Sequence, residues 1–149
     1  MDIREYPAVK IHQFVFLMDK LMDRELRKTG DLSFAQFMIL GAIHFKPGLS
    51  QRDIAIARQT TEAAVSRHIT SLAKKGFVVA KRNAKNRKEH ILKLTKKGQS
   101  LFEKDVRVVK KTFDSVGSHL SKKQTIELSK SFDILLSVLQ KEFPEFDCA

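Results

Sequence analysis

Hydrophobic residues near the start of the chain recur every three or four positions, which is the spacing of one face of an α-helix. They are Ile11, Phe14, Val15, Met18, Leu21, Met22 and Leu26. Pro7 precedes this run and Gly30 follows it, and both residue types are common at helix boundaries. The pattern predicts a helix of about five turns that ends at Gly30.

Two shorter helices are predicted next, each from a polar residue at the start of an apolar stretch. Ser33 stands three residues before Gln36, and Ser50 stands three residues before Asp53, which is the spacing of a capping box. The helix after Ser33 is almost entirely apolar and stops at residues 47–48, a Pro-Gly pair. We expect it to be more deeply buried than the first helix.

A fourth helix, over residues 60–75, has one apolar face and one small, polar face. The apolar face consists of Val65, Ile69 and Leu72. The opposite face carries Ala63, Arg67, Thr70 and Lys74, with Ser66 at its side. In the preceding helix we expect Ile54 and Ala57 to point inward, and a turn at residues 58–59 to join the two helices.

A strongly basic segment follows this helix. The stretch from Lys74 to Lys97 holds ten Lys and Arg residues and one acidic residue, Glu89. Residues 77–81 and 90–94 favour β-structure, and the segment between them is turn-like, so the pattern predicts a two-stranded hairpin with a cationic tip. A solvated charge run is the ordinary interpretation of such a segment, but its position beside an amphipathic helix favours a binding surface for a polyanion.

Two further apolar stripes follow residue 98, separated by a break at residues 117–121. Together with the first helix, they present more apolar surface than a globule of about ninety residues can cover. The surplus predicts packing against a second copy of the chain, and hence a homodimer. The alternative is that these helices fold back on their own domain.

Composition narrows the class of partner and the compartment. The chain has 149 residues, a net charge of +11 and a pI near 9.9, which favours a polyanionic partner over charge that serves solubility alone. The one cysteine, Cys148, has no partner within the chain, and no apolar run approaches the length of a membrane span. We therefore expect a cytoplasmic protein with no membrane association.

Side chains that would mark an enzyme are not grouped in this sequence. The five histidines are scattered over different predicted elements without metal-ligand spacing. No glycine-rich phosphate loop and no nucleophile paired with a base is present. The sequence predicts no catalytic residues, no metal site and no cofactor.

Several short motifs occur in an order that narrows the fold. They are Leu32-Ser33 with Gln36 and Ile39-Leu40, Asp53-Ile54-Ala55, Val65-Ser66-Arg67, Leu72 with Gly76-Phe77-Val78, and Leu94-Thr95 with Gly98. Together with the helix order, they resemble the multiple-antibiotic-resistance-regulator (MarR) family of bacterial transcription factors. The resemblance implies a mainly α fold with a small β-hairpin wing: a winged helix-turn-helix domain at residues 31–98, flanked by dimerisation helices at residues 1–30 and 99–149.

Two wing positions depart from the family's pattern. Asn86 stands where the family commonly has Asp, and Ala80 stands where it often has Arg. A neutral Asn cannot form the ion pair that helps to orient a wing arginine. Lys81 and Arg82 directly follow Ala80 and are expected to substitute for the missing strand arginine.

A protein of this family would bind double-stranded DNA with the fourth helix in the major groove and the hairpin on the adjacent backbone or minor groove. Arg67 is the first candidate for a base or phosphate contact, because its guanidinium can pair with two acceptors on guanine. The other predicted DNA-binding residues on the helices are Ser50, Gln51, Arg52, Thr60, Thr61, Glu62, Ala63, Ser66, Thr70 and Lys74. In the wing they are Arg82, Lys85, Arg87 and Lys88.

The resemblance further implies a small lipophilic or phenolic effector that enters between the DNA-binding lobe and the dimer helices. Phe14, Met18 and Phe37 are the candidates to line such a crevice, and the same side chains would equally suit an ordinary core. We predict a homodimeric regulator, a repressor, of a pseudo-palindromic operator. Two other classes stay open: a winged-helix module whose basic face binds an acidic protein, and an RNA-binding protein, which would need more aromatic residues than Phe77 in the basic segment.

Overall fold

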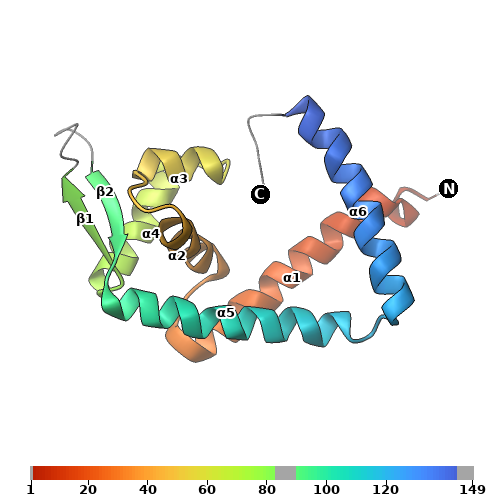
Figure 1. Cartoon of the computed structure of the whole chain (residues 1–149), viewed down its shortest axis with the longest axis horizontal. Helices are drawn as coiled ribbons and strands as arrows, with labels where there is room; N and C mark the ends of the chain where they lie inside the picture. The colour runs from red at the N-terminus through yellow and green to blue at the C-terminus, as the bar shows by residue number, and fades with distance from the viewer. Residues whose placement is uncertain (1, 83–89, 144–149) are drawn as a thin grey trace. The chain divides into compact units, whose positions relative to one another are not determined.

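The computed structural model describes residues 2–82 and 90–143. Its elements are the 3-10 helix η1 (Ile3–Glu5), α1 (Pro7–Gly30), α2 (Phe34–Phe45), α3 (Gln51–Ala57), α4 (Glu62–Lys74), β1 (Val78–Arg82), β2 (His90–Leu94), α5 (Lys96–Gly117) and α6 (Lys122–Glu142) (Figure 1). The predicted mainly α fold with a small hairpin is confirmed. The chain divides into two compact units, residues 1–112 and 113–149, and each is described by itself.

The predicted capping residues start the helices. Ser33 and Gln36 form a complete capping box at α2, and Ser50 and Asp53 form one at α3. Each box satisfies two backbone N–H groups that would otherwise lack partners at a helix start. The first helix ends at Gly30, as predicted, and its C-cap residue, Asp31, adopts the left-handed conformation (φ 52°).

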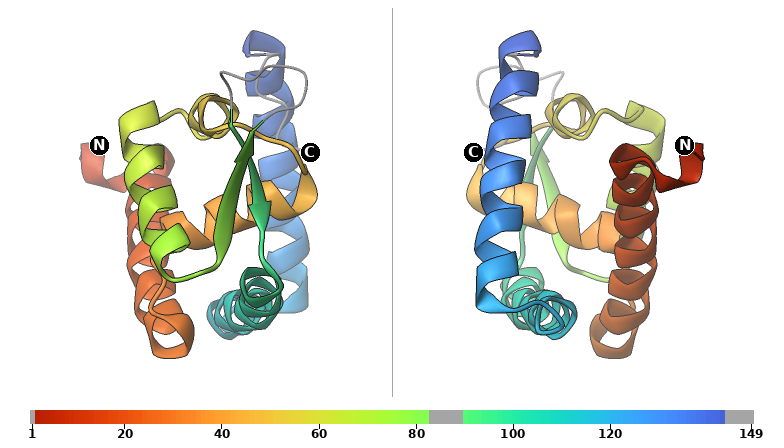
Figure 2. Two further views of the ribbon diagram at one scale, coloured as in Figure 1. Left: turned by 90° about the vertical axis from the view of Figure 1, so that its left-hand side faces the viewer. Right: turned by 90° about the vertical axis from the view of Figure 1, so that its right-hand side faces the viewer.

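The two strands form an antiparallel hairpin. Val78 pairs with Leu94 at its base and Arg82 pairs with His90 at the last described pair. The backbone N–H of Leu92 donates to Leu49 O at 2.9 Å, so β2 is also fastened to the segment before α3. Figure 2 shows α3 end-on, next to the beginning of α4, with the hairpin beside them. The helix-turn-helix and the wing therefore belong to one packed body.

One hydrophobic core joins α1, α2, α3, α4, the hairpin and α5 within residues 1–112. Its fully buried side chains include Leu26, Leu32, Leu40, Ile54, Leu72 and Leu92. At the contact between α2 and α5, the rings of Phe37 and Phe102 stack with their centroids 5.4 Å apart. This core is what holds α4 in place against α2 and α3.

The expected inward position of Ala57 is wrong. Ala57 is exposed, whereas Ile54 and Ala55 are buried. Because successive helical residues are rotated by about 100°, a buried face centred between Ile54 and Ala55 leaves Ala57 outside it. The error lies in the choice of face for a helix of seven residues.

The second unit, residues 113–149, contains α6. Ser121 caps this helix and forms the predicted box with Gln124. None of the residues described in α6 is buried, although the helix carries many large apolar side chains. No helix in the described ranges is both long and apolar enough to cross a membrane.

Candidate nucleic-acid interface

A tight turn between α3 and α4 sets the start of α4. Arg58 N donates to Ile54 O at 2.9 Å, and Thr60 N donates to Ala55 O at 3.0 Å. Gln59 between them has φ 49°, a left-handed conformation that reverses the chain. Thr61 then caps α4, because its Oγ1 accepts from Ala64 N at 3.1 Å. The α4 helix is therefore oriented by hydrogen bonds at its first turn.

The α4 helix divides into two faces as predicted. Val65, Ile69 and Leu72 are buried. The opposite side exposes Glu62, Ala63, Arg67, Thr70 and Lys74, with Ser66 half-buried at the edge and Thr60 and Thr61 exposed just before the helix. Near the end of the helix, Gln36 Nε2 donates to Ser71 Oγ at 3.2 Å and links α4 to α2. The exposed face is thus presented from a fixed helix.

At the start of α3, the side chain of Ser50 takes part in the capping box. Ser50 is buried, and its hydroxyl donates to Asp53 Oδ2 at 2.8 Å while it accepts from Asp53 N at 3.2 Å. The Ser50 backbone N–H also donates to Asp53 Oδ2, and these bonds lower the pKa of Asp53. The Ser50 side chain is therefore committed to the cap. Gln51 is half-buried and Arg52 is exposed.

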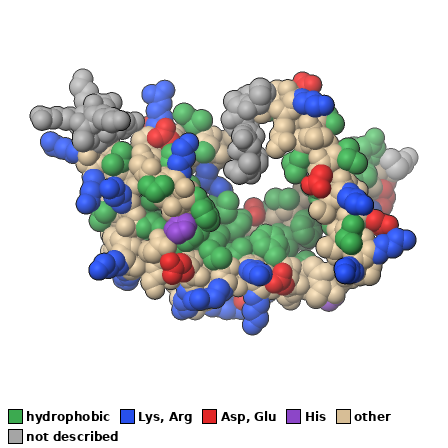
Figure 3. Space-filling view, in the orientation of Figure 1, with side chains coloured by type: hydrophobic (Ala, Val, Ile, Leu, Met, Phe, Trp, Pro, Cys, Tyr) green, Lys and Arg blue, Asp and Glu red, His purple; other side chains and the backbone are tan. Residues whose placement is uncertain are grey.

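Cations gather over the hairpin next to this surface (Figure 3). Lys81 and Arg82 on β1 and Lys93 on β2 are exposed. The remaining wing residues predicted to bind DNA, Lys85, Arg87 and Lys88, lie outside the described residues, as does Asn86.

Among the described residues, the cations of this surface form no ion pair with an acidic side chain. Within the described ranges, none of the following forms an ion pair: Arg52, Arg58, Arg67, Lys74, Lys81, Arg82 and Lys93. Unpaired and exposed guanidinium and ammonium groups are available to phosphate oxygens, and each phosphate contact releases condensed counterions. The surface is therefore both sterically open and positively charged.

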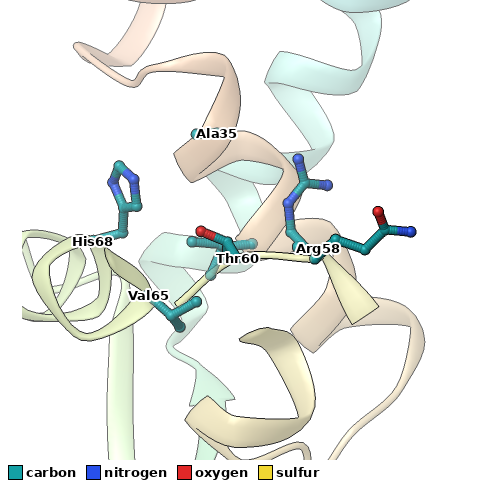
Figure 4. Close-up of a pocket in the computed structure, with 7 residues that line it drawn as sticks. Ala35, Arg58, Thr60, Val65 and His68 are labelled. Carbon is teal, nitrogen blue, oxygen red and sulfur yellow. The ribbon is translucent and has the colours of Figure 1, made fainter. Parts of the chain in front are cut away.

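A cavity of about 290 Å³ lies behind the beginning of α4. It is lined from α2, the turn and α4 by Ala35, Ile39, Arg58, Gln59, Thr60, Val65 and His68. Figure 4 shows His68 on one side and Arg58 on the other, with Thr60 between them. The cavity thus combines apolar walls with a guanidinium, an imidazole and a hydroxyl.

The three residues predicted to line an effector crevice do not line this cavity. Met18 and Phe37 are buried in the core, and Phe37 also stacks near Phe34, with ring centroids 6.1 Å apart. Phe14 is about half exposed on α1. Their role in ligand binding stays a prediction.

Arg58 and His68 were not among the residues predicted from the sequence to bind a ligand or DNA. The signal for Arg58 was its place in the predicted turn, and His68 lies between the buried and exposed faces of α4. Neither position has a periodicity that singles it out, because turn geometry decides what both side chains contact. Among the described residues, no group of three or more His, Cys, Asp or Glu side chains could hold a metal ion.

Comparison with known proteins shows which family the sequence of this chain resembles. A model described as the MarR family matches residues 30–89. The HTH-type transcriptional regulator BilQ of Clostridium symbiosum (strain WAL-14163) is 35% identical over 105 residues, which cover 70% of this chain and 72% of BilQ.

Solved structures show the same fold. Wild-type apo MarR from E. coli superposes with a TM-score of 0.80 at 20% identity, over 88% of this chain and 97% of MarR. The S. aureus MepR-DNA complex superposes with a TM-score of 0.74 at 24% identity, over 93% of this chain and 100% of MepR. With the fold, the family model and the BilQ relationship in agreement, the chain belongs to the MarR family of DNA-binding transcriptional regulators, and it is not an enzyme.

Proposed function

We propose that this protein binds a pseudo-palindromic operator as a homodimer and represses transcription, with α4 in the major groove and the hairpin on the flanking backbone or minor groove. The observation that carries the proposal is the exposed face of α4, which lies beside the hairpin (Figure 2), where the exposed cations Lys81, Arg82 and Lys93 form no ion pair with another described residue. A dimer bound to such an operator would exclude other proteins from the same stretch of duplex, which is the simplest physical route to repression.

The side chains on the exposed face of α4 suit contact with base edges. Ala63 and Ser66 are small, so the helix axis can approach the floor of the groove. Arg67 extends from the same face, and a bidentate contact with guanine would contribute about 1–3 kcal/mol of discrimination. Thr70 and Lys74 continue the face toward the backbone.

A second copy of the chain is proposed because two helices carry large apolar side chains that their own units leave exposed. On α1, Phe14, Val15, Phe16 and Leu17 are each at least half exposed. On α6, one exposed stripe consists of Leu128, Phe132, Leu135, Leu136 and Leu139. Helices keep such faces in folded proteins by packing them against other apolar surfaces. In the dimer, the two α4 helices would lie about 34 Å apart and read half-sites one helical turn apart.

A small lipophilic or phenolic effector that releases the DNA is part of the proposal. The supporting observation is the cavity behind α4, where Arg58 and His68 could hold an anionic group and Ile39 and Val65 an apolar ring. We expect a small aromatic acid to raise the melting temperature of the protein, and the Arg58→Ala variant to lose that response. An equal thermal shift in both proteins would remove this cavity from consideration.

The DNA assignment is tested by binding to a duplex selected from a random pool, over a series of salt concentrations. We expect Arg67→Ala to lose about 1–3 kcal/mol on the selected duplex and Arg82→Ala to flatten the salt slope by about one. The matched control is Arg24→Ala on α1, where the arginine pairs with Glu25 at 3.0 Å, and it should bind like the wild type. A module that recognises an acidic protein would bind duplex at neither low nor high salt.

The dimer is tested by sedimentation of two variants of α6. Leu139 lies in the exposed apolar stripe, whereas Ile134 is an equally apolar residue on the other side of the helix, 66% exposed. We expect Leu139→Asp to produce monomers and Ile134→Asp to leave the dimer intact. Monomeric wild-type protein at micromolar concentration would contradict the homodimer.

A further inference from the structure

A buried carboxyl group joins α5 to the end of α1 within residues 1–112. Asp105 lies on α5, and its exposed fraction is 0%. Its Oδ1 is 2.7 Å from Oγ1 of Thr29, a residue that lies 76 positions earlier in the chain. The sequence places Asp105 inside the apolar stripe of α5, between Leu101 and Val109, where a charged group is costly.

The Thr29 hydroxyl has more acceptors than it can serve at once. Thr29 Oγ1 is also 3.0 Å from Leu26 O in the preceding turn of α1. A hydroxyl carries one proton, so it can donate to Leu26 O or to an ionised Asp105, but not to both. A neutral Asp105 brings its own proton, and both short contacts then become hydrogen bonds.

The second carboxyl oxygen points to the same protonation state. Asp105 Oδ2 is buried and has no hydrogen-bond partner among the described residues. A carboxylate spreads its charge over both oxygens, so an ionised Asp105 would leave half of that charge in an apolar site. Desolvation by burial raises the pKa of Asp105, and the bond from Thr29 and the charge of Lys104 oppose that effect.

The end of α1 also holds the end of α4. Two residues beyond Thr29, the backbone O of Asp31 accepts from Lys75 Nζ at 2.6 Å, and the Asp31 carboxylate lies 3.1 Å from the same ammonium. Lys75 is the C-cap residue that directly follows α4. Gly30, which lies between Thr29 and Asp31 in the chain, packs so closely against Leu101 of α5 that an added Cβ would be 2.6 Å from Leu101 Cδ1. The contact between α1 and α5 therefore continues to the helix proposed to read DNA.

We propose that Asp105 is a protonation switch: when protonated it holds α1 against α5, and when ionised it loosens this contact and lowers the affinity of the protein for DNA. The coupling runs from Asp105 through Thr29 and Asp31 to Lys75 at the end of α4. The neutral acid turns both short contacts of Thr29 Oγ1 into hydrogen bonds and leaves only an uncharged oxygen, Oδ2, without a partner among the described residues, whereas the anion must acquire water or move out of the core. Higher pH would thus favour release of the operator.

Other charged groups around the joint are exposed or already paired. On α5, Lys104 Nζ is 3.4 Å from Thr29 O. On α1, Lys28 pairs with Glu25 at 2.7 Å, and Arg27 lies 3.8 Å from Asp31. The α2 helix packs on α5 through Phe37 and carries one titratable side chain, His44, whose Nδ1 is 2.9 Å from Gln99 Oε1.

The test compares wild type with Asp105→Asn, which keeps the shape of the neutral acid and cannot ionise. All other titratable groups are the same in the two proteins, so the DNA affinity of the wild type divided by that of Asp105→Asn isolates the effect of Asp105. We expect this ratio to fall about fivefold or more between pH 5.5 and pH 8.5, the usual range of coupling between sites. The matched control is Asp114→Asn, an exposed aspartate on the same helix, whose pH profile should follow the wild type.

The carboxyl carbon resonance of Asp105, followed by NMR in the free wild-type protein, gives a second arm that needs no DNA. We expect its midpoint well above the ordinary aspartate value near 4. A midpoint near 4, or an affinity ratio that is constant with pH, would overturn the proposal that Asp105 is a protonation switch. The DNA readout rests on the proposed role of α4: a wild-type protein that binds no duplex at any pH refutes that role and the link to DNA, while the NMR midpoint still decides whether Asp105 is held protonated.

Discussion

Gly98 lies in the first turn of α5, where the helix passes close to the backbone at the start of the hairpin. A Cβ added to Gly98 would lie 2.0 Å from Phe77 O and 2.8 Å from Phe77 C. These are backbone atoms of the segment that enters β1, and Phe77 O also accepts from Thr95 N at 3.0 Å. The backbone of Phe77 cannot move away from α5 without disrupting this hydrogen bond at the base of the hairpin.

The expected effect of Gly98→Ala is a balance of two terms. In a helix interior, alanine is favoured over glycine by about 1 kcal/mol. Overpacking against fixed atoms typically costs about 1–3 kcal/mol and occasionally more. Because the contact with Phe77 O is far inside van der Waals distance, we expect the upper end of that range, so Gly98→Ala should lower the free energy of unfolding by about 1–2 kcal/mol.

Gly117, at the other end of α5, provides the matched control. Nothing lies within 4 Å of an added Cβ at this position, and Gly117→Ala should be neutral or stabilising by a few tenths to about 1 kcal/mol. Urea denaturation followed by circular dichroism measures both variants under the same conditions. A Gly98→Ala protein as stable as Gly117→Ala would refute the close approach of α5 to the hairpin.

Two further predictions concern the body that supports α4. Asp53→Ala should cost about 1 kcal/mol in urea denaturation at pH 7 through loss of the capping box. Since the folded-state pKa of Asp53 is lowered, the stabilisation by its carboxylate is complete above the ordinary value near 4 and disappears as the pH falls through the lowered pKa. A stability deficit of Asp53→Ala that persists undiminished at strongly acidic pH would argue against this role of the carboxylate. Phe102→Ala should lower the free energy of unfolding by about 3–5 kcal/mol because it empties the ring stack with Phe37, and a loss below about 1 kcal/mol would mean that this contact is loosely packed.

Local signals predicted most of the elements. The boxes of Ser33 with Gln36 and Ser50 with Asp53 depend on residues three positions apart, so the sequence is sufficient to place these helix starts. The faces of α4 also followed from periodicity, because its thirteen residues cover several turns. The same reasoning failed at Ala57, where a helix of seven residues defines its buried face poorly.

Contacts between distant segments could not be predicted in this way. The bond between Asp105 and Thr29 joins residues 76 positions apart, and only the position of Asp105 in an apolar stripe hinted at it. The position of Arg58 and His68 at one cavity depends on the turn at Gln59. Side-chain function at such places is decided by tertiary geometry rather than by spacing.

The central claim is that α4 reads the major groove of duplex DNA from both halves of a dimer. Methylation protection of guanine N7 on a selected duplex tests it directly, because this atom lies in the major groove. We expect protected guanines in two half-sites about 34 Å apart, related by two-fold symmetry, and loss of protection at one guanine per half-site in Arg67→Ala. A selected duplex that is bound without any N7 protection, or with a single asymmetric half-site, would contradict the account.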